Sequence, residues 1–221
     1  MGTFKNGVLG GFSGKVGSVV GATWKGQNVM KIIPASVSNP RTPRQQAVRS
    51  RFSMMGHFLS TQRRLVSVGF KAYADTSTSF NAAMKYNLAH AIAGEYPDLT
   101  IDFSQARLSM GQLPVPSDLV AVVSSDKSIT LNWTDNSSME LASAGDILMV
   151  GVYDAETGSG YTLSGSYKRS DATGLITLPD NWAGRTVELF VFMVSPLSTG
   201  ETHSKEMVSE TLYMGSLLLT G

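Results

Sequence analysis

The residues from Gly10 to Gly26, GGFSGKVGSVVGATWKG, combine glycines and lysines in a pattern that could cradle a phosphate group. A P-loop requires Gly, four residues and then Gly-Lys-Ser/Thr, because its backbone N–H groups wrap the phosphates and its hydroxyl binds magnesium. Gly14-Lys15 is the candidate anchor, but Leu9 occupies the place of the first glycine and Val16 follows the lysine. The dinucleotide fingerprint Gly-x-Gly-x-x-Gly is also missing from this run. The stretch therefore favours a structural role over a nucleotide site.

The other residue types that perform chemistry do not converge on one site. Ser13, in GFSGK, is one residue short of the Gly-x-Ser-x-Gly nucleophile elbow. The chain has no cysteine, which excludes disulfides, thiolate metal ligands and a cysteine nucleophile. His57, His90 and His203 lack the spacing of metal ligands. Carboxylates gather in turns such as YDAETG (residues 153–158), without the alternating oxygen ligands of an EF-hand loop. We expect no catalytic, cofactor or metal site, and a protein that is not an enzyme.

Short strands account better for the glycine-rich run. The segment KVGSVVGATWKGQNVMKII is rich in Val and Ile and has a glycine every three or four residues, which predicts two or three short, bent strands over residues 14–33. The segment has too few large apolar side chains to form a hydrophobic core of its own, so it is expected to dock against helices or a neighbouring chain. The expected docking residues are Gly14, Gly17, Val19, Val20, Gly21 and Trp24.

A basic helix is predicted next. Thr42 and Pro43 form a helix start, with a capping hydroxyl before a proline at the first helical position. An apolar stripe at steps of four, three and four residues follows, formed by Val48, Phe52, Met55 and Leu59. The arginines remain for a basic face: Arg44, Arg49, Arg51, Arg63 and Arg64.

Further helices and strands complete the first half of the chain. A helix is predicted from a Thr78/Ser79 cap to a stop at Gly94, with a short helix around Gly69 before it. Phe80, Met84, Leu88 and Ile92 form the apolar stripe of the longer helix. The segment YPDLTIDFSQARLSMG is typical of two short strands. Residues 1–113 are therefore expected to form a basic α+β domain.

The second half of the sequence has the strand spacing that is typical of a β-sandwich. Gly111 to Ser117, with Pro114 and Pro116, is typical of a linker. Seven strand-like segments follow at a spacing of about ten residues, which predicts an antiparallel sandwich over residues 114–221. This domain is expected to fold alone, with Trp133, Phe190 and Phe192 in its core.

Charge is segregated along the chain. Residues 1–113 contain 13 Lys/Arg and 4 Asp/Glu, a net charge of +9, whereas residues 114–221 contain 5 Lys/Arg and 13 Asp/Glu, a net charge of −8. Such asymmetry indicates either a basic domain with an anionic partner or two poles of one molecule that attract each other.

Two resemblances add to this interpretation. LPVPSDLVAVVSSDKSITLNWTD, with Trp133, resembles the opening of fibronectin type III domains, although VELFVFMVS lacks their core tyrosine; an immunoglobulin-like variant fits as well. SGKVG, VVG and WKG, followed by the NPRTP turn into an Arg/Gln-rich helix, resemble a bacterial family of unknown function across essentially the whole chain. The resemblance implies no activity. The NPRTP segment is also similar to segments of phage structural proteins.

Three functions remain open. The first is a self-associating or particle-associated subunit of a virion, filament or surface structure, with the glycine-rich strands added to a neighbour's sheet. The second is nucleic-acid binding by the basic helices, although no recognised binding motif surrounds them. The third is an adhesion module that binds carbohydrate or protein. No run is long enough for a membrane span and the N-terminus lacks a secretory signal, so we expect cytoplasmic synthesis and no cofactor.

Overall fold

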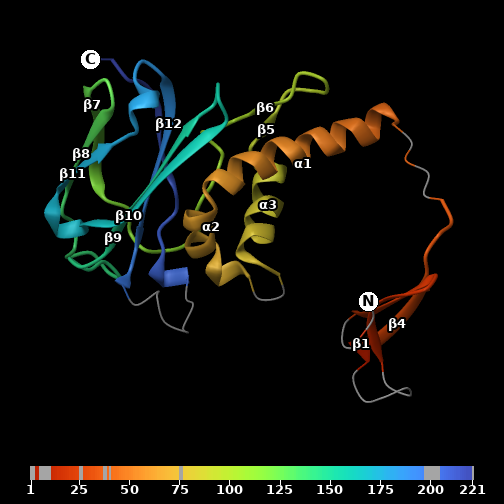
Figure 1. Cartoon of the computed structure of the whole chain (residues 1–221). Helices are drawn as coiled ribbons and strands as arrows, with labels where there is room; N and C mark the ends of the chain where they lie inside the picture. The colour runs from red at the N-terminus through yellow and green to blue at the C-terminus, as the bar shows by residue number, and fades with distance from the viewer. Residues whose placement is uncertain are drawn as a thin grey trace. The chain divides into compact units, whose positions relative to one another are not determined.

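The computed structural model of the chain describes residues 3–4, 11–24, 27–36, 39, 41–74, 77–196 and 205–220 (Figure 1). The chain divides into two compact units, Met1–Thr42 and Pro43–Gly221. The division therefore falls at the start of the first helix and not at the boundary expected between residues 113 and 114.

The first unit is an antiparallel sheet in the order β1-β2-β3-β4, as the glycine-rich run predicts. Its strands are β1 (Thr3–Phe4), β2 (Phe12–Val16), β3 (Val19–Trp24) and β4 (Gln27–Ile32). Gly17 in the turn between β2 and β3, and Gly21 beneath the Phe12 side chain, allow these strands to lie close together. No helix or second sheet belongs to the part of this unit that the structure describes.

The second unit begins with helices. They are α1 (Pro43–Thr61), α2 (Arg63–Gly69), the 3₁₀ turn η1 (Lys71–Tyr73) and α3 (Ser79–His90). The predicted start of α1 at Pro43 and the short helix around Gly69 are both present. The Thr78 hydroxyl caps α3 by accepting a hydrogen bond from the Asn81 N–H (3.2 Å). The helix ends four residues before Gly94, because Ile92 and Ala93 form a strand.

A two-stranded hairpin and a seven-stranded sandwich follow. The hairpin pairs β5 (Ile92–Ala93) with β6 (Thr100–Ile101), and the rest of the segment expected to form two strands is irregular. The sandwich strands are β7 (Ser117–Ser125), β8 (Ser128–Thr134), β9 (Ile147–Asp154), β10 (Ser159–Lys168), β11 (Thr173–Thr177), β12 (Thr186–Val194) and β13 (Leu212–Leu218). Short 3₁₀ turns are η2 (Arg169–Asp171), η3 (Asp180–Trp182) and η5 (Lys205–Met207).

The seven strands form two antiparallel sheets, β10-β9-β12-β13 and β11-β8-β7. The chain crosses between the sheets after β8, after β10 and after β11, while β7 and β8, β9 and β10, and β12 and β13 each pair within one sheet. This arrangement is the fibronectin III/immunoglobulin-like sandwich that the strand spacing predicts. The α+β segment followed by a β-sandwich is confirmed as the fold.

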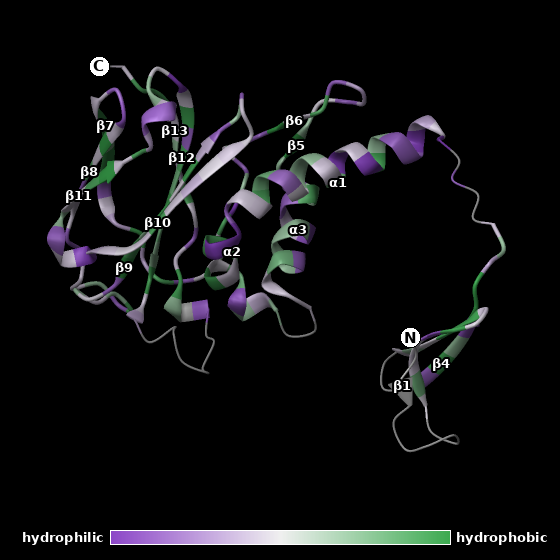
Figure 2. Ribbon diagram, viewed as in Figure 1, coloured by the Kyte–Doolittle hydropathy of each residue, from purple (hydrophilic) through white to green (hydrophobic). Residues whose placement is uncertain are grey.

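The helices form a third layer on the sandwich. In Figure 1 they lie on one side of the β10-β9-β12-β13 sheet, and β7, β8 and β11 lie on the other. Helical residues such as Met55, Phe58 and Leu65 share a buried apolar cluster with Phe190 and Phe192 of β12. Strand β12 is therefore buried on both faces, which explains its nearly continuous hydrophobic run (Figure 2).

This packing explains why the units divide at residue 42. Trp133 lies in the core between the two sheets, as expected, together with Ile129, Leu131, Val150 and Val191. Phe190 and Phe192 instead face the helices. The sandwich and the helices bury one another's apolar surface, so residues 43–113 belong with the sandwich and not with the glycine-rich strands.

Candidate functional site: an uncovered N-terminal sheet and a basic helix

The N-terminal sheet has one apolar face. Residues opposite each other in neighbouring strands share a face, and successive residues alternate between faces. The register aligns Val16, Val19 and Ile32 in one row and Gly14, Gly21 and Met30 in the next. The N-terminal apolar face consists of Phe12, Val16, Val19, Met30 and Ile32. Ile32 is 78% exposed, Met30 66% and Val16 45%, so the described residues of this unit provide no layer that covers the face.

Two glycines fit the sheet for different reasons. Gly17 occupies the turn between β2 and β3 with φ of +60°, a backbone conformation that residues with a β-carbon rarely adopt. Gly21 is buried beneath Phe12, and a β-carbon there would lie 2.2 Å from the Phe12 carbonyl oxygen. The expected role of these glycines in backbone shape and close approach therefore has a structural basis.

The opposite face of this sheet is mixed. Lys15, Val20 and Lys31 form one row on it, with both lysines exposed. Of the expected docking residues, the sheet brings Gly14, Val19 and Gly21 to the apolar face and places Val20 on the other. Gly17 lies in the turn. Trp24 pairs with Gln27 through the backbone, and its side chain lies outside the described residues.

Helix α1 presents a second uncovered apolar stripe. Met55 and Leu59 are fully buried against the body, whereas Val48 and Phe52, on the same side of the helix, are 52% and 55% exposed. The first turns of α1 extend beyond α3 in Figure 1. A surface groove of about 530 Å³ between the two helices includes Phe52 and Leu88 in its lining. The predicted stripe is thus one continuous face, of which only the second half is covered.

The five predicted arginines are all exposed but do not form one basic face. Arg44 and Arg51 lie on the same side of α1, and Arg49 is rotated by about 140° from Arg44 at 100° per residue. Arg63 belongs to α2, where its guanidinium lies 5.6 Å from the centre of the Phe80 ring. Arg64 lines a different groove, beside strand β9. The structure therefore distributes these charges around two helices.

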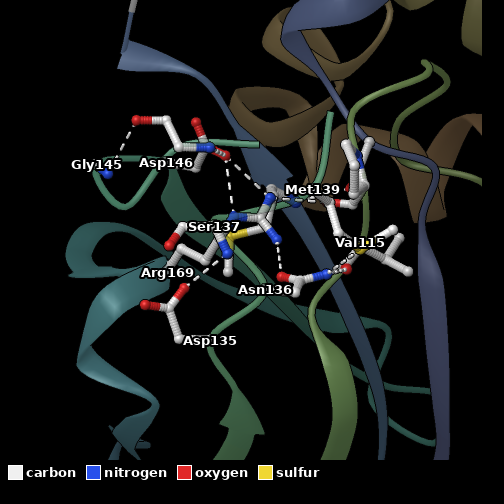
Figure 3. Close-up of polar contacts among 12 residues, drawn as sticks. Val115, Asp135, Asn136, Ser137, Met139, Gly145, Asp146 and Arg169 are labelled. Carbon is white, nitrogen blue, oxygen red and sulfur yellow. Dashed lines mark hydrogen bonds and ion pairs between the residues drawn. The ribbon is translucent and has the colours of Figure 1, made fainter. Parts of the chain in front are cut away.

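A buried polar cluster joins the loops at one end of the sandwich (Figure 3). Arg169, in η2, is fully buried and pairs with the equally buried Asp146, with Nη2 3.0 Å from Oδ2. The same guanidinium donates to Asn136 Oδ1 and to the Pro114 carbonyl oxygen (2.8 Å). The Arg169 carbonyl accepts a hydrogen bond from Trp133 Nε1 (2.8 Å). Because the cluster is closed to solvent, it holds the start of the sandwich and two loops together and offers no access to a ligand.

The turn YDAETG is held by its first carboxylate. Asp154 accepts hydrogen bonds from the Thr157 hydroxyl (2.6 Å), the Glu156 N–H (2.9 Å) and the Arg185 guanidinium (2.8 Å). Burial acts to raise the pKa of Asp154, but these hydrogen bonds outweigh it and hold the pKa below its ordinary value of 3.8. The carboxylate is 1% exposed and already neutralised by an arginine, so this turn is a structural cap rather than a calcium loop.

A third polar cluster lies on strands β12 and β13. Glu188 accepts hydrogen bonds from the Tyr213 hydroxyl and from the Ser216 hydroxyl (2.8 Å). Burial and the bond to Glu188 raise the pKa of Tyr213 above its ordinary value. Glu188 is paired directly with Ser216 in the strand register, so this cluster ties an edge strand to the sheet.

Two of the three histidines form hydrogen bonds with backbone carbonyl oxygens. His57 Nε2 lies 2.9 Å from the Gly158 carbonyl oxygen, and His90 Nδ1 lies 2.8 Å from that of Tyr86. His203 lies outside the described residues. Within the part of the chain that the structure describes, no group of three or more His, Asp or Glu residues is placed to hold a metal ion. The described helices also include none that is long and apolar enough to cross a membrane.

Sequence reasoning missed two of these features. Nothing in the local sequence SYKRSD marks Arg169 as buried, because its partners come from residues 23 to 55 positions away. The exposure of Met30 and Ile32 had a weak signal, since NVMKII alternates as a strand while the rest of the unit lacks the apolar residues needed to cover it.

These observations define a class of protein: an immunoglobulin-like sandwich with a helical cover, preceded by a small sheet with an uncovered apolar face. Within that class the chain belongs to DUF6266, a family of unknown function, which matches residues 11–213. The matched range spans the SGKVG, VVG, WKG and NPRTP segments, and the predicted resemblance to a family of unknown function is confirmed.

Solved structures similar to the chain include fibronectin type III domains. The fn3 domain of the human collagen alpha-1(XX) chain is 13% identical, with a TM-score of 0.35, over 49% of this chain and 86% of that one. The FN5 domain of Drosophila Lar is 9% identical, with a TM-score of 0.32, over 48% of this chain and 95% of that one. No curated protein matches the sequence.

Proposed function

We propose that this protein is a non-enzymatic structural subunit that self-associates, or joins a particle, filament or surface structure, through its N-terminal apolar face. The observation that carries the proposal is the exposure of Met30 and Ile32 on a compact unit of some forty residues. A single small sheet without a covering layer is only marginally stable in water, and units of this size ordinarily need a staple or a partner. A partner that covers this face would supply the missing layer.

The geometry favours docking by shape over ligand binding. Gly21 leaves room for Phe12 above the sheet, and Gly17 adopts the positive φ that the turn between β2 and β3 requires. Both glycines are therefore needed for the shape of the N-terminal apolar face. Lys15, the residue that a phosphate site would need, belongs to the opposite face. An exposed apolar surface of this kind is typical of a protein interface.

The test replaces two apolar residues in the full-length protein. We expect the wild type to self-associate in light scattering, and Met30→Asp/Ile32→Asp should reduce that association, because charge is costly to bury in an apolar interface. The matched control is Lys15→Ala/Lys31→Ala, which changes the opposite face of the same strands and should leave most of the association intact. If the aspartate variant associates as tightly as the wild type, the N-terminal apolar face is not the docking surface.

Nucleic-acid binding is the second candidate, and one observation favours it. Residues 1–74 contain eleven Lys/Arg and no Asp/Glu, so the first unit and the first two helices are uniformly cationic. The dispersal of the arginines around α1 and α2 argues against one phosphate-tracking face. We expect DNA or RNA binding no tighter than about 10⁻⁵ M at physiological salt, within the range of non-specific association. Submicromolar binding that Arg44→Ala/Arg49→Ala/Arg51→Ala weakens would reverse this ranking.

A further inference from the structure

We infer that the N-terminal apolar face docks on the outer face of the β11-β8-β7 sheet of a second copy of this chain. The inference rests on the function proposed above and names the surface that receives the docking unit. The acceptor face is defined by the exposed apolar residues Val120 and Val122 of β7 and Leu175 of β11.

The acceptor face is built by strand register. Val122 and Leu175 each lie opposite Thr130 of β8, and Val120 lies opposite Asn132, so these side chains form two adjacent rows on the solvent side of the sheet. Val120 is 54% exposed, and Val122 and Leu175 are each 49% exposed. The inward residues of β7 pack against the core between the sheets. The sandwich thus packs one sheet between the helices and the core and leaves the other open on one side.

Both faces are sheet surfaces of similar width. The docking face carries apolar residues on three strands, whereas the acceptor face carries them on its outer strands β7 and β11, with Thr130 and Asn132 of β8 between them. Sheets pack face to face through their side chains at a separation of about 10 Å. Docking would turn the three-layered second unit into a four-layered one. It would also cover both uncovered apolar sheet faces at once.

The opposite charges of the docking unit and of the acceptor face favour contact between these two surfaces. The docking unit, residues 1–42, contains five Lys/Arg and no Asp/Glu, a net charge of +5, and residues 114–221, which form the sandwich, have a net charge of −8. Carboxylates flank the acceptor face at both ends of its strands, with Asp118 and Asp171 at one end and Asp126 at the other. Lys127, at the second end, is already paired with Asp180 (2.6 Å). A cationic docking unit is therefore attracted to this face over a distance comparable to the Debye length.

The exposed stripe of α1 is the competing acceptor, and its charge is unfavourable. Val48 and Phe52 stand among Arg44, Arg49 and Arg51, and residues 41–74 contain no acidic residue. A docking unit whose charged residues are all Lys or Arg would be repelled there. The acidic half of the molecule offers the apolar surface with the opposite charge.

The proposed contact is heterologous, because it joins different surfaces of the two copies. Each copy keeps a free docking unit or a free acceptor face, so association continues into a ring or an open chain. Faces of three short strands lie below the size of standard stable interfaces, so a single contact is expected to be weak and to require protein concentrations of tens of micromolar or more.

The experiment uses two full-length variants, each with one surface disabled. Variant one is Met30→Asp/Ile32→Asp, and variant two is Val120→Lys/Val122→Lys, which adds positive charge to the acceptor face. Each variant alone should be monomeric by sedimentation velocity, with association weakened about a hundredfold or more. An equimolar mixture should form a one-to-one dimer and nothing larger, because one intact docking unit meets one intact acceptor face. Association of the wild type should weaken as salt concentration rises.

Three results would overturn the inference, and they are distinguishable. If variant two assembles like the wild type, or if Phe52→Lys abolishes assembly instead, the acceptor lies elsewhere while the proposed function stands. If assemblies disperse on nuclease treatment, nucleic acid is the partner. If the wild type is monomeric at every concentration, the self-association that the proposed function includes fails together with this inference. Circular dichroism checks the folding of variant two, and Val120→Thr/Val122→Thr, which keeps the β-branched shape, should weaken association in the same direction.

Discussion

At the scale of residues, two kinds of position hold the second unit together. Arg169 joins the linker before β7 to both ends of the loop between β8 and β9, because its guanidinium bonds to Pro114, Asn136 and Asp146 at once. Gly69 permits a close approach, since a β-carbon there would lie 2.2 Å from the Leu108 carbonyl oxygen. Neither role is visible in the local sequence, because both depend on contacts made by distant segments.

Replacing Arg169 should destabilise the protein strongly. Arg169→Ala leaves the buried Asp146 without its counter-charge, which we expect to cost about 3–5 kcal/mol in the free energy of unfolding. Lys168→Ala, next to it but exposed, should change that free energy by less than about 0.5 kcal/mol. Urea denaturation measures both variants. A loss below about 1 kcal/mol for Arg169→Ala would mean that the cluster is not sealed.

Two helical glycines should respond in opposite ways to the same substitution. Gly56, inside α1, has no atom within 4 Å of an added β-carbon, so Gly56→Ala should stabilise the protein by about 0.5–1 kcal/mol. Gly69→Ala, at the end of α2, meets rigid backbone and should destabilise it by about 1–3 kcal/mol. Thermal or urea unfolding distinguishes the signs. Stabilisation by both changes would contradict the close approach of α2 to Leu108, in the segment that follows β6.

At the scale of elements, the sequence predicts single elements better than their partnerships. The β8 segment SITLNWT alternates apolar and polar residues, β7 contains an apolar run from Leu119 to Val123, and the turn signals between strands are local, so the seven strands could be located in advance. The same holds for α1, where Pro43 and the spacing of Met55 and Leu59 are local features. Which layer covers which face is decided by contacts between segments far apart.

Strand β12 carried a signal that could have revealed the third layer. TVELFVFMV is apolar at nearly every position, whereas a strand with one solvent face alternates. The domain boundary expected at residue 114 overlooks this feature, because a sandwich whose β12 is exposed on one side would present Phe190 and Phe192 to water. The uncovered faces of the N-terminal sheet and of β7 had no comparable signal, since exposure depends on what the rest of the chain fails to cover.

The shared core of the helices and the sandwich argues against the expectation that residues 114–221 fold alone. Residues 114–221 alone should fail to give a soluble, cooperatively folding domain, because removal of the helices exposes Met149, Tyr153, Phe190 and Phe192. Residues 43–221 should unfold cooperatively as one unit, since helices and sandwich share a core. Circular dichroism and urea titration of both fragments provide the comparison. Cooperative unfolding of residues 114–221 with the stability of the longer fragment would show that the helices contribute little.

At the scale of the whole molecule, composition and architecture support the same account. The cationic first third contains the small uncovered sheet, and the acidic remainder contains the uncovered face of β7 and β11. Charge segregation of this extent was evident from the sequence. The structure adds two exposed apolar sheet faces, one on each side of that division.

The central claim is that residues 1–42 drive self-association, and sedimentation velocity tests it most directly. The full chain and residues 43–221 are compared at equal molar concentration and moderate salt, after nuclease treatment. The account predicts that the full chain of 23.6 kDa forms species of two or more copies in a concentration-dependent manner, while residues 43–221 remain a folded monomer. Equal association of the two proteins, or a full chain that stays monomeric at every concentration, would contradict it.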